Sequence, residues 1–353
     1  MVSEPLLDVS GILACKMWYT FETIRRSMRV YMPRTWEQVT GRYDVIILSD
    51  ANVKSFETRH LEWFAQGVEE GGLGLAMVGG FESFGGHGYQ SWGDTTVGNI
   101  LPVLCPDQYN AEGQIEILRR QNPVVSNLPW ETLGSSNYFG GNIVIPKEGS
   151  ELVANMRTGS KRYPLLVWWD AGEGRSFAMA ADWTPAAGTA FMRWEYYGDF
   201  CVNLVLFTGM AEVPGDIELV HSVRDVLRQC VQTSNYLYAT IDFAERFGAS
   251  PRQPEETALE ARELIQQARA LYLGYEFESA HSTALQALNR FERGLEEALQ
   301  ARETALYWIY VIEYLVVTGT CMISGTVIYM LMIRRRLYRP SELTRLSGRR
   351  YSR

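Results

Sequence analysis

The sequence of 353 residues has little of what disulfide frameworks and metal centres are built from. Its five cysteines are scattered without a CxxC pair, and its four histidines stand far from one another. A disulfide-stapled domain or a zinc site needs paired or clustered ligands at short spacing. We therefore expect no disulfide framework, no bound metal and no cofactor.

The sequence also lacks a signal-peptide pattern and, outside its last residues, an excess of positive charge. No charged start followed by an apolar stretch is present, so either the N-terminus is cytoplasmic or the true start lies upstream. Residues 334–353 hold eight Arg and one Glu, which leaves a net charge of −15 on residues 1–333 of a chain at −8. Such an acidic body predicts that nucleic acid is not a partner.

The pattern of residues 43–78 predicts a strand–helix–strand unit. Val45–Leu48 is a continuous apolar and β-branched run, which is typical of a parallel strand covered on both faces. The run LGLAMV at 73–78 predicts the next strand. Between them, apolar residues recur at helical spacing at Leu61, Phe64, Ala65 and Val68. Short connections between the three elements indicate a right-handed βαβ unit and hence an α/β fold.

Further elements are expected on both sides of this unit. Before it, Leu6–Leu13 is expected to supply a strand and Phe21–Arg29 a short helix with a basic face. After it, the expected elements are strands at 141–147 and 151–156, a β-hairpin within 165–182 and a helix over Phe191–Met210.

A glycine-rich loop, GGFESFGG at residues 79–86, follows the strand at 73–78. In open α/β sheets, ligands gather just beyond the carboxyl ends of the strands. Glycines there let backbone N–H groups approach an anion, and a carboxylate after the neighbouring strand would complete a polar pocket. The candidate ligand-binding residues are Asp50, Gly79, Gly80, Glu82, Ser83, Gly85 and Gly86. For Asp50, helix capping or turn formation is the role that its position after the strand favours.

Five segments together resemble one known family. In chain order they are YDVIILSD, VEEGGLGLAMVGGFESFGG, NILPV, NPVVSNLPW and GEGRSFAMAADW. Over roughly residues 35–215 they are similar to the glutamine amidotransferase-like domain family, which belongs to the class I glutamine amidotransferase-like superfamily and is related to trehalose-utilisation-type proteins. The resemblance implies a flavodoxin-like layered α/β fold.

The resemblance also directs attention to a missing nucleophile. In class I glutamine amidotransferases a Cys occupies a G-x-C-x-G turn after a strand, and a His and a Glu that follow activate it. Here the turn reads GGFESFGG without Cys, and no H-x-E pair follows near the end of the domain. Because amide attack needs a thiolate and a base, we expect no glutaminase activity and regard a non-enzyme as the better hypothesis.

One alternative activity is kept open. Ser83 and His87 are four residues apart, with Glu82 beside them and Asp94 in the same loop. A hydrolase acting on carbohydrate or amide substrates would use Glu82, Ser83 and His87 in a Ser-His-acid arrangement. Local hydrogen bonding within the loop is the competing role for these side chains.

The sequence changes to helical patterns after residue 215. Residues 217–247 carry apolar residues at helical steps, a Pro-containing linker follows at 248–256, and two further helices meet at a turn at 273–275. These two helices are similar to a single tetratricopeptide-type hairpin. A single repeat does not bury its own face, so the hairpin is expected to pack on itself, on the α/β domain or on a copy of itself.

Residues 305–333 are predicted to form a transmembrane helix. They hold one charged residue, Glu313, and Tyr314–Ile333 alone gives roughly 30 Å of uncharged helix, enough to cross a bilayer. Aromatic residues mark one end and Arg334–Arg336 the other, as is typical of a membrane span. Glu313 is expected either to reach the interface or to pair with a partner helix.

We thus expect an α/β domain over 1–215, a helical hairpin and stalk over 216–304, a transmembrane helix over 305–333 and an Arg-rich tail over 334–353. The positive-inside rule favours a cytoplasmic tail and an extracytoplasmic body at the cell membrane, whereas the missing signal peptide favours the reverse. Expected partners are the bilayer and an unidentified small molecule or protein, with the domain or the hairpin as the binding part. Self-association through the transmembrane helix or the hairpin is left open.

Overall fold

The computed structural model describes residues 4–17, 19–136, 138–183, 191–248 and 252–337. It divides the chain into two compact units, and each is described by itself. The sheet unit comprises Met1–Asp225 with Arg269–His281, and the helical unit comprises Val226–Ala268 with Ser282–Arg353.

The sheet unit is built on a mixed sheet of seven strands in the order β1-β2-β9-β8-β7-β4-β5. The first three strands are parallel, and all other pairings are antiparallel. The strands are β1 (Val45–Ser49), β2 (Gly74–Val78), β4 (Tyr109–Ile117), β5 (Tyr138–Asn142), β7 (Glu151–Thr158), β8 (Lys161–Ala171) and β9 (Gly174–Met179). Two short strands, β3 (Val103–Leu104) and β6 (Ile145–Pro146), pair separately. The predicted α/β fold class is confirmed.

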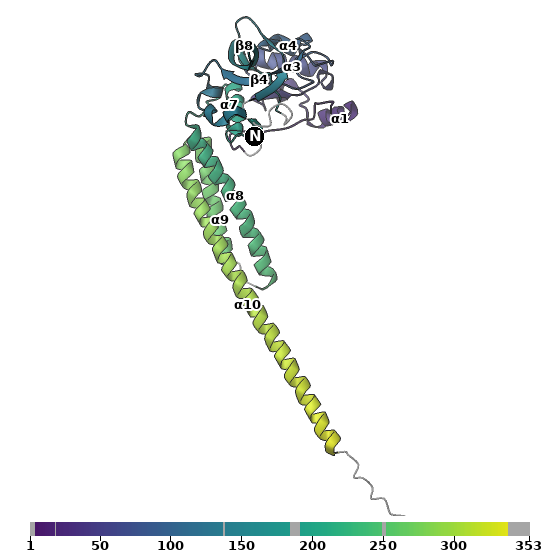
Figure 1. The fold of residues 1–353 in the computed structure, drawn as a ribbon, viewed down its shortest axis with the longest axis vertical. Helices are drawn as coiled ribbons and strands as arrows, with labels where there is room; N and C mark the ends of the chain where they lie inside the picture. The colour runs from purple at the N-terminus through teal and green to yellow at the C-terminus, as the bar shows by residue number, and fades with distance from the viewer. Residues whose placement is uncertain (1–3, 18, 137, 184–190, 249–251, 338–353) are drawn as a thin grey trace, which may run out of the picture. The chain divides into compact units, whose positions relative to one another are not determined.

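Helices cover both faces of the parallel strands. The crossover helix α3 (Thr58–Glu69) and the later helix α7 (Tyr197–Thr208) both contact β2 and β9, from opposite sides (Figure 1). The remaining helices are α1 (Phe21–Tyr31), α2 (Trp36–Thr40), α4 (Thr96–Ile100) and α5 (Pro123–Ser126), with 3-10 turns η1 (Val53–Ser55), η2 (Trp92–Asp94) and η3 (Trp130–Ser136). The predicted βαβ unit, the hairpin now seen as β8–β9 and the short basic helix α1 are therefore confirmed.

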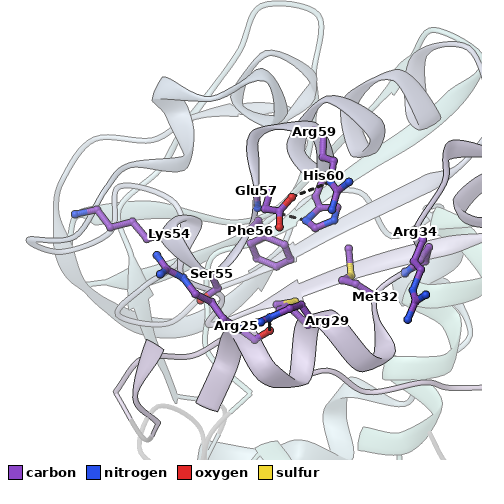
Figure 2. A pocket seen from close by; sticks show the side chains of 12 residues that line it. Arg25, Arg29, Met32, Arg34, Lys54, Ser55, Phe56, Glu57, Arg59 and His60 are labelled. Atoms are coloured by element: carbon purple, nitrogen blue, oxygen red, sulfur yellow. Dashed lines mark hydrogen bonds and ion pairs between the residues drawn. The ribbon is translucent and has the colours of Figure 1, made fainter. Parts of the chain in front are cut away.

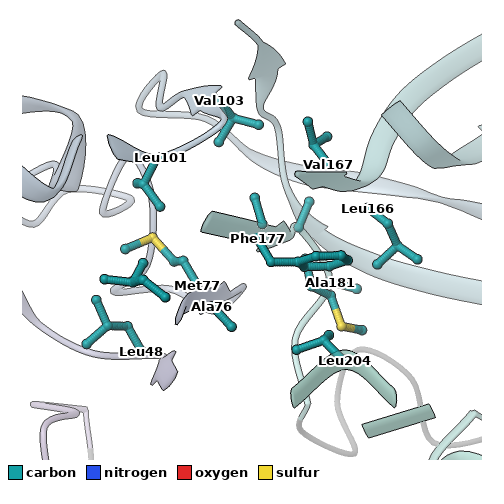
Figure 3. Close-up of a cluster of buried hydrophobic side chains, with 14 of the residues drawn as sticks. Leu48, Ala76, Met77, Leu101, Val103, Leu166, Val167, Phe177, Ala181 and Leu204 are labelled. Carbon is teal, nitrogen blue, oxygen red and sulfur yellow. The ribbon is translucent and has the colours of Figure 1, made fainter. Parts of the chain in front are cut away.

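The core explains why β2 is apolar without alternation. All five of its residues are buried, because α3 and α7 leave neither face to solvent. Figure 3 shows Leu48, Met77 and Phe177 of three adjacent strands packed together with Leu204 of α7. Each such side chain contributes roughly 1.5–3 kcal/mol through removal from water.

Two expectations about strands were wrong, and one strand was not predicted. Leu6–Leu13 forms a turn followed by irregular chain. The Leu7 N–H donates to the nearby Glu4 carbonyl, and the Ala14 carbonyl just after the segment accepts from the Asn52 N–H, so these groups do not pair with a strand. The strand expected at 141–147 is split after Asn142, and Pro146 has no N–H for a continuous ladder. The sequence pattern did not indicate β4, whose run YNAEGQIEI is mostly polar.

A buried charge cluster ties the N-terminal segment to the helices of the sheet unit. Arg224 of α8 (Ile217–Arg246) is ion-paired with Glu4 and with Asp199 of α7, and all three side chains are nearly buried. Its Nε also donates to the hydroxyl of Tyr272, which itself donates to Glu4 at 2.8 Å. His221 Nδ1 lies 3.0 Å from the other oxygen of Asp199. One guanidinium thus balances two carboxylates that water does not reach.

The helical unit contains the rest of α8, most of α9 (Arg252–Leu273) and most of α10 (Phe277–Leu337). Small side chains allow these helices to approach one another closely. Fully or almost fully buried residues of this unit include Ala258, Ala261, Ala284, Ala287, Phe291 and Ala298. The predicted turn between the last two helices lies at Gly274–Tyr275, where Tyr275 has a φ of 61°.

The predicted span lies inside α10, which runs without a break for 61 residues. In the described part of the chain, this is the one helix long and apolar enough to cross a membrane by length and composition. Its most apolar window has a mean hydropathy of 1.8, and none of that window is buried in the structure. Large apolar side chains from Leu315 to Ile333 are therefore exposed.

Replacing Arg224 with Met is expected to destabilise the sheet unit by about 3–5 kcal/mol, because two buried carboxylates lose their counter-charge. The control is Arg162→Met, which breaks the exposed pair with Glu116 and is expected to leave the stability nearly unchanged. Chemical unfolding followed by tryptophan fluorescence measures both, since nine of the ten tryptophans precede residue 225. Equal losses in the two variants would contradict the assigned role of Arg224.

Candidate functional site

The glycine-rich turn follows β2 directly and lies against the end of β1. Gly80 has a φ of 144°, and a Cβ there would overlap the carboxylate of Asp50. Asp50 itself adopts a φ of 45°, which L residues other than Asn and Asp rarely accept. Close approach of these two residues is the reason that the turn needs glycine.

Two buried polar side chains hold the turn in place. Asn142, at the end of β5, accepts from the Gly80 N–H at 2.9 Å and donates to the Gly80 carbonyl at 3.1 Å. Ser83 donates to the Val78 carbonyl at 2.6 Å and is 1% exposed. Trp92 adds a hydrogen bond from its indole N–H to the Ala51 carbonyl at 2.8 Å. The turn is thus fixed by its own Ser83, by Trp92 just after it and by Asn142 from a distant strand.

Glu82 is the buried carboxylate of the turn, with no exposed surface. Its Oε2 accepts from the Lys16 N–H at 2.8 Å, and its Oε1 accepts from the Met17 N–H at 2.7 Å. The backbone N–H of Glu82 donates to Asp50 Oδ1, also at 2.8 Å. The N-terminal segment, residues 4–17, is therefore anchored on a side chain of the predicted site.

Cys15 brings a thiol to this site. Its Sγ lies 3.2 Å from Asp50 Oδ2 and 3.8 Å from Glu82 Oε1. Burial, followed by the charge of Asp50 and its hydrogen bond, raises the pKa of the thiol to about 12. The thiol is thus protonated at neutral pH, whereas a nucleophilic cysteine needs a basic or cationic neighbour that lowers its pKa.

His87 lies apart from Ser83. It is exposed, has a φ of 32°, and its ring packs on Phe81 and Tyr109 at centroid distances of 5.6 Å each. Phe81 and Tyr109 stack on each other at 4.6 Å. Burial, together with the charges of Asp182 and Asp50, raises the pKa of Tyr109 to about 12. His87 thus belongs to an aromatic cluster at the rim of the site.

The remaining glycines have steric roles. A Cβ at Gly85 would overlap the Pro106 carbonyl, and Gly86 has a φ of 81°. Gly79 donates its N–H to the carbonyls of Met179 and Ala181 and extends the β2–β9 pairing. These backbone groups bond to the protein itself, and the ligand-binding role of the seven candidate residues stays a prediction.

Sequence reasoning missed three contributors. Cys15 and Asn142 are distant from the loop in sequence, and no local pattern marks either as its neighbour. Trp92 is fully buried and helps to hold the loop through its indole N–H, a role that its sequence position does not indicate.

Comparison with known families agrees with this architecture. The family model GATase1_like, described as "Putative glutamine amidotransferase", matches residues 24–208, just over half of the chain. The chain belongs to this family. The suspected resemblance is confirmed, although this GATase1-like domain has Glu82 and Ser83, and no cysteine, in its turn.

Two solved structures are similar to the GATase1-like chain. One is the "Cytoplasmic Protein STM3548 from Salmonella typhimurium", with 27% identity and a TM-score of 0.44 over 52% of this chain and 78% of that one. The other is the "Cytoplasmic Protein STM1381 from Salmonella typhimurium LT2", with 25% identity and a TM-score of 0.43 over 50% and 76%. No curated protein matches the chain.

The GATase1-like site has polar groups that are already engaged. Glu82 binds two backbone N–H groups, Ser83 binds a carbonyl, and Asp50 binds both the Glu82 N–H and a thiol. Among the residues that the structure describes, no group of three or more His, Cys, Asp or Glu side chains is arranged to hold a metal ion. The hydrolase hypothesis depends on a Ser83–His87 contact, and these two side chains have other partners.

The raised pKa of Cys15 predicts its reactivity. Alkylation follows the thiolate fraction, which for a free cysteine is about half near pH 8.5. In the folded chain the labelling of Cys15 by iodoacetamide should therefore stay low between pH 7 and 9. Because the unfolded thiol ionises first, this residue also lowers the stability of the fold as the pH rises from about 8.5 towards 12.

Asp50→Asn is expected to speed this labelling, since it removes the neighbouring charge that disfavours the thiolate. The control is Asp107→Asn, an exposed carboxylate in the same region that accepts from the Gly88 N–H. Peptide-level mass spectrometry separates Cys15 from the other four cysteines. Labelling of the unaltered protein at the rate of a free thiol would show that the carboxylates do not control Cys15.

Proposed function

We propose that this chain is a membrane-anchored GATase1-like protein that has no glutaminase activity and serves as a binding or scaffold module. The observation that carries the proposal is the state of Cys15, the one thiol at the turn where the superfamily keeps its nucleophile. It lies between Asp50 and Glu82, which favour the protonated form.

The surroundings of the turn support the same conclusion. An amidotransferase needs free backbone N–H groups to stabilise an oxyanion, whereas the N–H groups of Gly79, Gly80 and Glu82 donate to protein acceptors. Glu82 and Asp50 also place two carboxylates where negative charge would develop during amide attack. The site is arranged for a stable fold and against this reaction.

The anchor is proposed to be the apolar part of α10. Its exposed apolar surface would be costly in water, and a bilayer would cover it. Eight Arg in residues 334–353 favour a cytoplasmic tail, because translocating that tail would be difficult. The GATase1-like domain would then be extracytoplasmic, and Glu313, Thr320 and Ser324 would be available to a partner helix or a second copy.

The first test is a glutaminase assay on the full chain. Ammonia release from glutamine is expected to stay at the level of buffer, and Cys15→Ser is expected to leave it unchanged. Glutamine-dependent ammonia release that disappears in Cys15→Ser would overturn the proposal. Iodoacetamide labelling under the assay conditions serves as the control that Cys15 is in its native, unreactive state.

The second test is protease treatment of bacterial spheroplasts that express the chain with a C-terminal tag. The sheet unit should be digested from outside while the tag remains protected. Replacing Arg334, Arg335 and Arg336 with Gln should lower the protected fraction of the tag, since it weakens the positive-inside signal. A body that is digested only after lysis would reverse the proposed orientation.

A further inference from the structure

Two adjoining cavities lie beside α1 in the sheet unit, and Cys15, at one end of the smaller one, also contacts the glycine-rich turn. One measures about 840 Å³ and the other about 470 Å³, both within the roughly 300–1,000 Å³ typical of ligand sites. They share part of their lining, namely Met28, Met32, Pro33 and Phe56. A single ligand with two chemically different parts can therefore occupy both.

The larger cavity is strongly basic. Figure 2 shows side chains of α1, of the following segment and of the η1–α3 region around it, among them Arg25, Arg29, Arg34, Lys54 and Arg59. Glu57 is the one acidic residue of the lining, and it is paired with Arg59 at 2.8 Å. Within the described part of the chain, the other four cations have no carboxylate partner. Residues 1–333 carry a net charge of −15, yet among the described residues these four cationic side chains around the cavity have no carboxylate beside them. We infer that they bind an external anion.

His60 also lines this basic cavity as a neutral side chain. His60 is 5% exposed, and its Nδ1 accepts from the Glu57 N–H at 3.3 Å, which places the ring proton on Nε2. Burial lowers the pKa of His60, so the ring is neutral at pH 7. Arginine forks match the oxygens of a phosphate group better than those of a single carboxylate, because a phosphate can engage several forks together.

The smaller cavity is apolar and runs along the edge strand β1. Its lining includes Ile12, Leu13, Val45 and Ile47, and the three outer residues of β1 are only half-buried. The strand is the last in the sheet order, and residues 7–15 pass beside it without forming a strand. Val9 and Leu13 also remain about two-fifths exposed, at 42% and 40%. Most of the apolar side chains of β1 and of residues 7–15 that line this cavity are therefore only partly covered by the protein.

We propose that the paired cavities bind an anionic phospholipid, with its phosphate in the basic cavity and an acyl chain in the apolar one. A soluble phosphate compound would leave the apolar cavity without a role, and a neutral lipid would leave four cations without a partner. The basic amphipathic helix α1 between the two cavities has the composition of elements that contact anionic lipid surfaces. This inference rests on the proposed membrane anchor in one respect only, namely that the anchor would bring the protein next to a bilayer that supplies the lipid.

The test uses the full chain in neutral detergent, with dioleoylphosphatidylglycerol as the probe and dioleoylphosphatidylcholine as the neutral lipid. Native mass spectrometry should show retention of the former at least about tenfold better than the latter. Arg25→Gln with Arg29→Gln should lower the affinity on the order of tenfold or more. The matched control is Arg26→Gln, on the same helix but outside the cavity lining.

A second variant tests the acyl-chain site. Gly11 lines the apolar cavity and has open space for a Cβ, so Gly11→Phe should fill the cavity without straining the fold. It should reduce phosphatidylglycerol binding while leaving the binding of inorganic pyrophosphate unchanged. Gly215→Phe, at another exposed glycine with open space, should change neither.

The outcomes separate the possibilities. Equal retention of the two lipids, or equal binding by the Arg25/Arg29 variant and the Arg26 variant, overturns the proposal. Pyrophosphate binding that needs the arginines, together with lipid binding that ignores Gly11→Phe, overturns the lipid in favour of a soluble phosphate. Because detergent-solubilised protein is used, a different membrane orientation or an active glutaminase would not alter these results.

Discussion

The structure of the sheet unit depends on two adjacent carboxylates being satisfied at the carboxyl end of β1 and β2. Glu82 is completely buried, and a buried carboxylate without partners would cost several kcal/mol. The N–H groups of Lys16 and Met17 prevent that cost, and Asp50 in turn accepts the N–H of Glu82. Folding of the turn and docking of the N-terminal segment are therefore one event, because neither satisfies its polar groups alone.

The same electrostatics explain the chemical character of the site. Cationic or basic neighbours would lower the pKa of a thiol, whereas burial, together with the charges of Asp50 and Glu82, raises that of Cys15 to about 12. The Cys15 thiol is therefore held in its protonated form at neutral pH. In this GATase1-like domain the turn has two carboxylates beside the Cys15 thiol.

The sequence was informative where one local pattern determined the structure. Burial on both faces makes Val45–Leu48 and the run at 73–78 continuously apolar, so the βαβ unit followed from periodicity. The antiparallel half of the sheet was harder to predict from the sequence. Strand β4 carries Asn, Glu, Gln and Gly, which do not indicate a strand, and it is stabilised by its pairing with β5 and β7. The resemblance located the turn correctly, but it did not reveal what surrounds it.

The site was less predictable than the fold because its contacts are distant in sequence. Cys15 meets Glu82 across 67 positions, and Asn142 meets Gly80 across 62. No spacing rule connects such residues without the completed sheet. Ser83 and His87 show the converse. Their spacing of four residues suggested a catalytic pair, but the Ser83 side chain is buried and the His87 side chain is exposed.

The anchoring of the N-terminal segment also accounts for the open edge of the sheet. The Ala14 carbonyl accepts from the Asn52 N–H and the Ser55 hydroxyl, while the next residues are bound by Glu82. With its polar groups engaged at this end, the segment does not continue as a strand on β1. An edge strand that is neither paired nor closely covered leaves apolar surface open. The cavity beside β1 therefore lies next to the part of the N-terminal segment that the carboxylates of the turn hold in place.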